Sequence, residues 1–334
     1  MNHNTHDEPF PSAQNIQDLA TGFQRSRVLL TAHELGVFTS LGDEACTSDE
    51  VAADLDLDAR ATDRLMNALV ALGFLRKEDG RFVNVPGSAR YLVQGKPDYM
   101  GNLMHSVHLW DTWSTLSEAV RHGSSVIKKD VAQRDEPWLD AFIAAMHWRA
   151  VKHAPQVVAL IDLAGVKRVL DVGGGSGAFA MGFARAKEGM ESVVFDLPSV
   201  VPLTRKYIQQ AGMSDRVRTA EGNYKTDLLG SGFDLAFLSA IIHSNSPGEN
   251  RDLLRKCVAA LNPRGQVAIV DFIMNEERTA PPQATFFSLN MLVGTEAGDT
   301  FTESEVRAWM QDARLSDIVR KETPFGTAML IGRK

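Results

Sequence analysis

Cysteine is scarce in this chain, which contains only Cys46 and Cys257, far apart and without CxxC or Cys/His spacing. The scarcity excludes a disulfide framework and a thiolate zinc site, and it favours a reducing, cytoplasmic environment. The chain also lacks an apolar run near the ~18 residues that a membrane-spanning helix needs. Its polar, acidic first residues contain no apolar core of a secretory signal. We therefore expect a soluble, cytoplasmic protein with no membrane partner.

The chain also has no excess of positive charge. Lysine and arginine number 35 against 42 aspartate and glutamate residues, a formal net charge of −7, so nucleic acid is not an expected partner. Internal repeats and low-complexity tracts are absent from the sequence. A length of 334 residues predicts two domains at roughly 150 residues each.

The N-terminal part has the pattern of a winged helix. Apolar residues recur at helical spacing through residues 13–41, interrupted at Gly36. A capping signature at residues 47–50 begins the next helical segment, and a further helix is expected at residues 59–72. Residues 74–83 then predict a hairpin around an Asp-Gly turn. This order of helix, turn, helix and hairpin is typical of a winged helix.

Winged helices often bind DNA, so that reading must be compared with a packing or subunit-contact module. Six basic residues stand against eight acidic ones between positions 47 and 90. A surface that contacts phosphates needs the opposite balance. The charges therefore favour the packing or subunit-contact module.

Residues 100–160 predict further helices rich in aromatic and histidine side chains. Trp110 and Trp113 are three residues apart and so share one helix face. Periodicity alone does not separate a core stripe from the lining of a cavity, and both interpretations stay open.

After residue 163 the pattern changes to short apolar strands that alternate with helices. The strands are expected at residues 168–172, 192–196, 217–220, 235–238 and 266–272, and the helices at residues 177–186, 200–211 and 249–261. This alternation predicts an α/β fold with a doubly wound, mostly parallel sheet. Ligands of such sheets bind beyond the carboxyl ends of the strands, so functional residues should follow the strands directly.

A glycine-rich loop, residues 173–177, follows the first of these strands. Glycines there let the backbone approach a ligand at a helix N-terminus. The loop also satisfies the dinucleotide pattern GxGxxA, with Asp196 about 20 residues further on. Asp171, two positions before the first glycine, distinguishes a site for a cationic ligand from a site for the pyrophosphate of a dinucleotide. A carboxylate that points into the ligand cleft suits a cationic ligand better than a pyrophosphate.

Five motifs in order and register resemble class I S-adenosylmethionine-dependent methyltransferases of the acetylserotonin and caffeate O-methyltransferase type. They are VLDVGGGSG at 169–177, FDLP at 195–198, EGNY at 221–224, LSAIIH at 238–243 and NPRGQVAIVDF at 262–272. The resemblance covers nearly the whole chain. It implies an N-terminal, mainly helical winged-helix dimerisation domain, a C-terminal Rossmann-like domain and a homodimer.

The resemblance also implies which residues hold S-adenosylmethionine. Gly173 and Gly175 would contact its methionine part, with Asp171 near the amino group. Asp196 would accept hydrogen bonds from the ribose hydroxyls, with Leu197 against the adenine.

Three further cofactor positions differ from the family pattern. Asn223 and Tyr224 stand where the family has an Asp-Met pair beside the adenine, and the Asn carbonyl is able to accept from an adenine amino group. Ser239 replaces a frequent lysine, which implies a weaker contact.

His243 falls where the resemblance places the general base. Imidazole suits that role, because it titrates near neutrality and is able to take a proton from a hydroxyl. The usual continuation His-Asp-Trp is here His243-Ser244-Asn245. Asp271 matches the first carboxylate that supports the base. Thr300 aligns with the second, a glutamate, although Asp299 is able to take its place after a small shift.

Six residues are the expected contacts of the methyl acceptor. Met146 and Met291 match two methionines that clamp an aromatic substrate, and a thioether and aromatic cluster suits a flat ring. The remaining four are Trp110, Trp113, Phe287 and Asn290. An ordinary core stripe would have the same pattern.

The leading hypothesis is a methyltransferase that moves a methyl group from S-adenosylmethionine to a hydroxyl of an aromatic or polycyclic small molecule. The expected parts are a dimerisation domain at residues 1–100, a helical linker lining the substrate pocket at 101–160, and a cofactor-binding catalytic domain at 161–334. No metal is expected. One alternative is transfer to nitrogen or carbon, or a relative that binds the cofactor without methylating. Another, of a different class, is a winged-helix regulator that senses a ligand.

Overall fold

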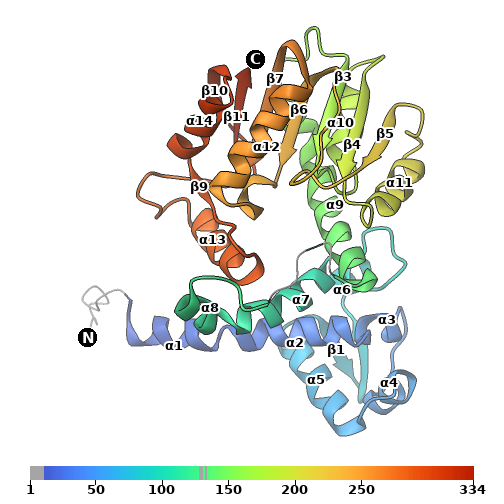
Figure 1. Ribbon diagram of the computed structural model, residues 1–334. Helices are drawn as coiled ribbons and strands as arrows, with labels where there is room; N and C mark the ends of the chain where they lie inside the picture. The colour runs from blue at the N-terminus through green and yellow to red at the C-terminus, as the bar shows by residue number, and fades with distance from the viewer. Residues whose placement is uncertain (1–10, 128–130, 132–133) are drawn as a thin grey trace, which may run out of the picture. The chain divides into compact units, whose positions relative to one another are not determined.

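The computed structural model describes residues 11–127, 131 and 134–334 of the chain, and it divides into two compact units (Figure 1). The first unit is Met1–Val107 and the second is His108–Lys334. Helix α7, Leu103–Ser114, contains the boundary between the units.

The first unit has the winged-helix order that the sequence predicts. Its elements are α1 Ala13–Thr21, α2 Phe23–Glu34, α3 Val37–Leu41, α4 Ser48–Leu55, α5 Ala59–Ala71, β1 Leu75–Glu78, β2 Arg81–Asn84 and α6 Pro86–Tyr91. Strands β1 and β2 pair antiparallel through a two-residue turn. Asp79 and Gly80 in that turn have φ angles of 49° and 79°, as the turn type that matches strand twist requires.

The expected capping signature begins α4. The Thr47 hydroxyl accepts from the Glu50 amide at 3.2 Å, and the Glu50 carboxylate accepts from the Thr47 amide at 2.7 Å. Arg81 of β2 donates to the same carboxylate at 2.8 Å. The cap therefore also joins the hairpin to α4.

Buried apolar residues of α2, α3, α5 and the hairpin form the core of the first unit, with Phe38 and Phe82 almost fully enclosed. One buried polar residue joins its parts. The Asn84 side-chain amide donates to the carbonyl oxygens of Phe38 at 2.9 Å and Gly42 at 2.8 Å. Asn84 thus satisfies the carbonyl groups at the end of α3.

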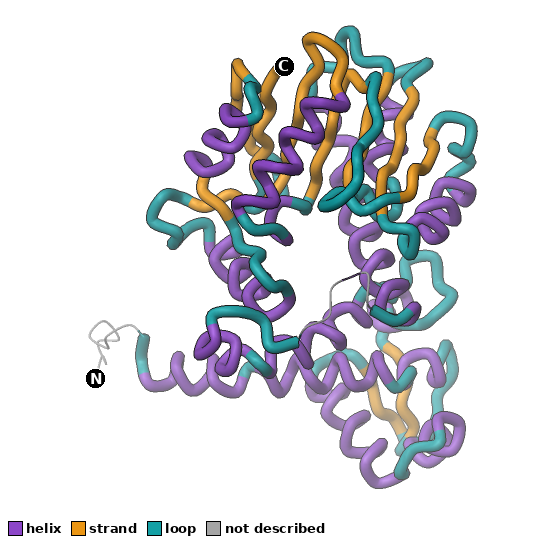
Figure 2. The backbone as a smooth tube through the Cα atoms, viewed as in Figure 1, coloured by secondary structure: helices purple, strands orange, loops and turns teal. Residues whose placement is uncertain are grey.

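The second unit is a sheet covered on both faces by helices (Figure 2). Its helices are α8 Leu116–His122, α9 Glu136–Ala159, α10 Ala178–Ala186, α11 Val201–Gln210, α12 Pro247–Ala260, α13 Pro282–Gly294 and α14 Glu303–Asp312, with a 3-10 turn at Ile242–Ser244. Its strands are β3 Arg168–Val172, β4 Glu191–Asp196, β5 Val217–Glu221, β6 Phe233–Ser239, β7 Leu261–Asp271, β8 Ile273–Met274, β9 Phe301–Thr302, β10 Ser316–Glu322 and β11 Ala328–Arg333.

The large sheet has seven strands in the order β10-β11-β7-β6-β3-β4-β5. Strands β7, β6, β3, β4 and β5 are parallel, which confirms the α/β fold and most of the expected strands. The other two were not predicted: β11 runs antiparallel to both of its neighbours, β7 and β10, so β10 runs in the same direction as the five parallel strands. β10 is mostly exposed and carries charged residues, so its sequence lacks the apolar signature of a buried strand.

Two helical layers enclose this sheet (Figure 1). Helices α12 and α14 pack on one face around Trp309, and α9, α10 and α11 pack on the other. Gly182 of α10 lies so close to α9 that an added Cβ would be 3.1 Å from the Ala154 Cβ. The C-terminal half of α9 is therefore packed tightly on α10.

The topology brings the ends of four neighbouring strands to one edge of the sheet. β3 ends at Val172, β4 at Asp196, β6 at Ser239 and β7 at Asp271. Parallel strands have their carboxyl ends on the same side. The glycine-rich loop and the segments that follow Asp196, Ser239 and Asp271 therefore begin at this edge.

We expect Asn84→Ala to destabilise the protein. The substitution leaves the Gly42 carbonyl group without its side-chain donor and the Phe38 carbonyl group with the Gly42 amide alone, and this costs about 1–3 kcal/mol of unfolding free energy. Chemical denaturation of both proteins measures the loss. Asn67→Ala is the control, because Asn67 is exposed; an equal effect of both substitutions would contradict the role of Asn84.

Candidate active site

The glycine-rich loop between β3 and α10 depends on left-handed backbone conformations. Gly173, Gly175 and Gly177 have φ angles of 62°, 56° and 75°, which residues with a Cβ rarely adopt. At Gly173 there is no space for a side chain either, because a Cβ would collide with Ile241. The loop thus brings its backbone close to the segment that follows β6.

Asp171 does not point into an open cleft, contrary to expectation. It is 1% exposed, and its carboxylate accepts from the Ala180 amide in α10 at 3.1 Å. A Cβ on Gly174 would lie 2.6 Å from the same carboxylate oxygen. Burial raises the pKa of Asp171 to about 7, and the charge of Asp196 adds to the shift. Asp171 supports the loop and α10 from below, because the loop folds back over it.

Asp196, the last residue of β4, also holds the loop. Its two carboxylate oxygens accept from the amides of Gly175 at 2.7 Å and Leu197 at 2.8 Å. Burial raises the pKa of Asp196 to about 6, although these two hydrogen bonds oppose the shift. Leu197 packs with Ile143 and other apolar residues of α9 and α11.

The three remaining cofactor candidates differ in what they contact. The Asn223 side-chain oxygen accepts from the Lys225 amide at 2.9 Å and so closes a turn. The Tyr224 hydroxyl donates to Asn245 at 3.1 Å, and its ring lies on the Gly173 side of the loop. Ser239 is half-buried at the end of β6.

His243 and Asp271 form a buried pair. The 3-10 turn after β6 carries His243, which is 8% exposed, and Asp271 ends β7 and is 2% exposed. The His243 Nδ1 lies 2.7 Å from the Asp271 carboxylate, which also accepts from the Phe272 amide at 2.8 Å. A carboxylate only accepts hydrogen bonds, so Nδ1 carries the proton and the Nε2 lone pair of the neutral ring is left for a reaction.

Neither candidate for a second supporting carboxylate contacts the His243 ring. The Thr300 hydroxyl is buried and lies 2.8 Å from Met274 Sδ and 3.1 Å from the Ala284 carbonyl oxygen. The Asp299 carboxylate is paired with Arg278 at 3.1 Å. Asp299 instead donates its backbone amide to the His243 carbonyl oxygen at 2.9 Å. This loop therefore holds the backbone of His243, and the ring has a single carboxylate partner.

Gly298 makes this backbone contact possible. A Cβ at this position would collide with the His243 carbonyl oxygen and would lie 2.5 Å from the Thr295 hydroxyl. Sequence spacing gave no signal for this position, because its neighbour in space is 55 residues away along the chain.

Helix α13 carries three of the six expected acceptor contacts, Phe287, Asn290 and Met291. The Phe287 ring meets the His243 ring edge to face at a centroid distance of 4.8 Å. Trp113 donates from its indole N–H to the Asn290 side chain at 2.9 Å. Met291 is almost fully buried, whereas Trp110 of α7 and Met146 of α9 are half-buried. The structure thus brings together Phe287 with His243 and Trp113 with Asn290.

Two contacts to the glycine-rich loop were not predicted. The Thr204 hydroxyl of α11 donates to the Gly175 carbonyl oxygen at 2.6 Å. His147 of α9 has its Nδ1 2.9 Å from the Ser176 hydroxyl. Both partners lie 29 residues from the loop, so no local pattern could pair them.

Metal-binding groups and membrane-spanning helices are both absent from the described residues. No group of three or more His, Cys, Asp or Glu side chains among them is arranged to hold a metal ion. No helix in the same part of the chain has the length and apolar character to cross a membrane.

The buried acids give the protein without cofactor a specific pH dependence. An aspartate whose folded pKa is raised binds more protons in the native than in the unfolded state, so the unfolding free energy falls as pH rises from about 4 to about 7. We expect Asp171→Asn to reduce the loss of thermal stability between pH 5 and 8. The exposed Asp215→Asn is the control, and an unchanged pH profile for Asp171→Asn would contradict the raised pKa.

Comparison with protein-family models matches both parts of the chain. Residues 113–315 match the O-methyltransferase domain, and residues 17–94 match the O-methyltransferase dimerisation domain. The 3-hydroxy-5-methyl-1-naphthoate 3-O-methyltransferase of Streptomyces sahachiroi is 34% identical over 329 residues, which are 96% of this chain and 94% of that protein.

Solved structures agree with the same assignment. The structure of PigF with S-adenosylhomocysteine superposes with a TM-score of 0.89 at 25% identity, over 97% of this chain and all of that one. Human N-acetylserotonin methyltransferase in complex with S-adenosylmethionine gives a TM-score of 0.84 at 25% identity, over 99% of each chain. These matches favour the enzyme over the winged-helix regulator, and the chain belongs to the O-methyltransferase family that carries this dimerisation domain.

Proposed function

We propose that this chain transfers a methyl group from S-adenosylmethionine to a hydroxyl of an aromatic or polycyclic small molecule, with His243 as the general base. The observation that carries the proposal is the buried His243–Asp271 pair at the edge of the sheet where the glycine-rich loop begins. In the Streptomyces sahachiroi relative, the acceptor is a hydroxylated naphthoate, which is the class of molecule that we propose here.

The residues at the end of β3 and β4 fit this cofactor. The left-handed glycines leave the loop backbone bare of side chains on the side where a ligand approaches. The Asp196 oxygens each accept one backbone amide, and a carboxylate oxygen has a second lone pair for a ribose hydroxyl. When bound, S-adenosylmethionine supplies a sulfonium-activated methyl group. Gly173 and Gly175 would face its methionine part, and Leu197 and Tyr224 would flank the adenine.

His243 would act on the acceptor. Its Nε2 would take the hydroxyl proton as the acceptor oxygen bonds to the methyl carbon that S-adenosylmethionine would supply, with S-adenosylhomocysteine as the leaving group. Asp271 fixes the ring and stabilises its protonated form, as a carboxylate does for histidine in hydrolytic triads. The Asp299 amide and Gly298 hold the backbone of the base in place.

Aromatic side chains would orient the acceptor. Phe272 and Phe287 lie with ring centroids 4.5 Å apart beside the base, and a flat ring packs well against such a surface. The Trp113–Asn290 hydrogen bond and Met291 extend this side of the site along α13. Trp110 and Met146 are proposed acceptor contacts from α7 and α9.

We expect His243→Ala to lower the turnover number by about 10²- to 10⁴-fold while the affinity for S-adenosylmethionine stays nearly unchanged, because the imidazole serves the acceptor. Asp271→Asn should cause a smaller loss. The measurement uses isotopically labelled methyl donor, a panel of phenols, naphthols and hydroxynaphthoates, and mass spectrometry of the products.

His122→Ala is the control, since His122 lies exposed on α8. Wild-type rates for His243→Ala would overturn the general-base role. Methylation of amines or ring carbons with no methylated hydroxyl would instead favour the nitrogen or carbon alternative.

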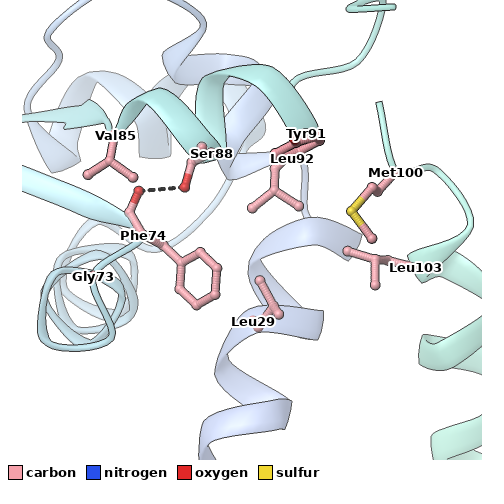
Figure 3. Close-up of a pocket in the computed structure, with 10 residues that line it drawn as sticks. Leu29, Gly73, Phe74, Val85, Ser88, Tyr91, Leu92, Met100 and Leu103 are labelled. Atoms are coloured by element: carbon pink, nitrogen blue, oxygen red, sulfur yellow. Dashed lines mark hydrogen bonds between the residues drawn. The ribbon is translucent and has the colours of Figure 1, made fainter. Parts of the chain in front are cut away.

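We further propose that the protein is a homodimer formed through its N-terminal unit, and that it works in the reducing cytoplasm with both cysteines free. Helix α1 contains no buried residue and exposes Ile16 and Leu19, and Phe23 at the start of α2 is exposed as well. The same unit has an apolar pocket of about 330 Å³ with Leu29 and Phe74 among its lining residues (Figure 3). Both features fall mainly within the matched dimerisation domain, and a second copy would cover them.

We expect Leu19→Asp to shift the protein from dimer to monomer. Burying a leucine stabilises an interface by roughly 1.5–3 kcal/mol, so the dimer dissociation constant should rise by at least about tenfold. Light scattering across a dilution series measures this. Leu228→Asp is a matched control, because Leu228 is 83% exposed and Leu19 is 84% exposed. A wild-type protein that is monomeric and active would refute the dimer.

A further inference from the structure

His147 is a half-buried histidine on α9 that the proposed chemistry does not use. Its Nδ1 lies 2.9 Å from the hydroxyl of Ser176, the one serine of the glycine-rich loop. Its ring also stacks on Tyr207 of α11 at a centroid distance of 4.0 Å and an interplanar angle of 25°. Ser176 is 3% exposed, so this hydrogen bond is shielded from water.

The loop is held from three different elements. Asp196 at the end of β4 accepts from the Gly175 amide, Thr204 of α11 donates to the Gly175 carbonyl oxygen, and His147 of α9 bonds to Ser176. Strand β4 and the neighbouring helix α11 belong to the packed sheet domain. The contact from His147 connects the loop by a hydrogen bond to the N-terminal half of α9, residues 136–147.

The two halves of α9 are attached differently. The C-terminal half packs tightly on α10 through Ala154 and Gly182, whereas the N-terminal half contacts the loop region through Ile143 and His147. Pro155 lies inside the C-terminal half and removes one hydrogen bond of the helix ladder there. The N-terminal half, which also carries Met146, is held at the loop by the side-chain contacts of Ile143 and His147.

We propose that His147 is a positioning residue that locks the N-terminal half of α9 onto the glycine-rich loop and so slows release of the cofactor and of its demethylated product. This inference rests on the proposed function, since it takes the loop to hold S-adenosylmethionine. Opening the loop then requires the His147–Ser176 hydrogen bond to break. The helix with Met146 and the loop therefore move as one unit.

The test measures dissociation of S-adenosylhomocysteine from the full-length protein by stopped-flow displacement, with affinities from calorimetry. His147→Phe keeps an aromatic ring on Tyr207 and removes the bond to Ser176. A net hydrogen bond is worth about 0.5–1.5 kcal/mol, so we expect dissociation to become roughly 2- to 12-fold faster. Ser176→Ala should have a similar effect, and the double variant should be no faster than either single one, because both remove the same bond.

His153→Phe is the matched control. His153 also lies on α9 and also stacks on an aromatic ring, that of Phe325, so a general effect of losing a histidine from this helix would appear in both variants. His147→Asn places an amide nitrogen near the Nδ1 position and should restore slow dissociation in part.

Three results would overturn the inference: wild-type dissociation for His147→Phe, fully additive effects in the double variant, or an equal effect of His153→Phe. If His147→Phe does not fold, the smaller change Ser176→Ala decides alone. Failure of the wild-type protein to bind S-adenosylmethionine or S-adenosylhomocysteine would instead reject the proposed function, and the inference with it.

Discussion

The common edge at which the parallel strands β3, β4, β6 and β7 end is the constraint on which the rest of the site depends. The chain leaves this edge at the end of each of these strands, and each exit carries a residue of the proposed chemistry or its support. The glycine-rich loop turns back over the sheet because three of its glycines adopt left-handed conformations. Asp196 and Asp271 therefore end separate strands at the same edge of the sheet where the turn with His243 begins.

Two buried acids make the cofactor side of this edge electrostatically sensitive. Asp171 and Asp196 both have pKa values raised by burial, to about 7 and about 6. The same carboxylates accept the backbone amides that hold the loop and the start of α10. The ionisation of Asp171 and Asp196 therefore depends on the structure of the glycine-rich loop. A cationic ligand bound beside the loop would favour the charged forms of both carboxyl groups.

On the side proposed for the methyl acceptor, His243 is held by the Asp271 carboxylate and by a backbone hydrogen bond from Asp299. Thr300 stands where the family resemblance implied a glutamate, and its hydroxyl is directed to Met274 and Ala284. The adjacent Asp299 contributes its amide to the His243 carbonyl oxygen. His243 is thereby positioned through its main chain as well as through its ring, and a side chain at Gly298 would collide with its carbonyl oxygen.

The sequence by itself determined the winged-helix and sheet order, the glycine-rich loop, and the positions of Asp196, His243 and Asp271 at strand ends. These follow from local periodicity and from the shared direction of parallel strands. Only the tertiary structure decided that Asp171 is buried under the loop, that Asp299 acts through its amide, and that His147 of α9 contacts Ser176. The charged edge strand β10 was missed for another reason, because it is mostly exposed and lacks the apolar pattern of a buried strand. The contacts of Asp299 and His147 join residues far apart in the chain, and they depend on helix packing and side-chain rotamers that no local pattern of apolar and polar residues specifies.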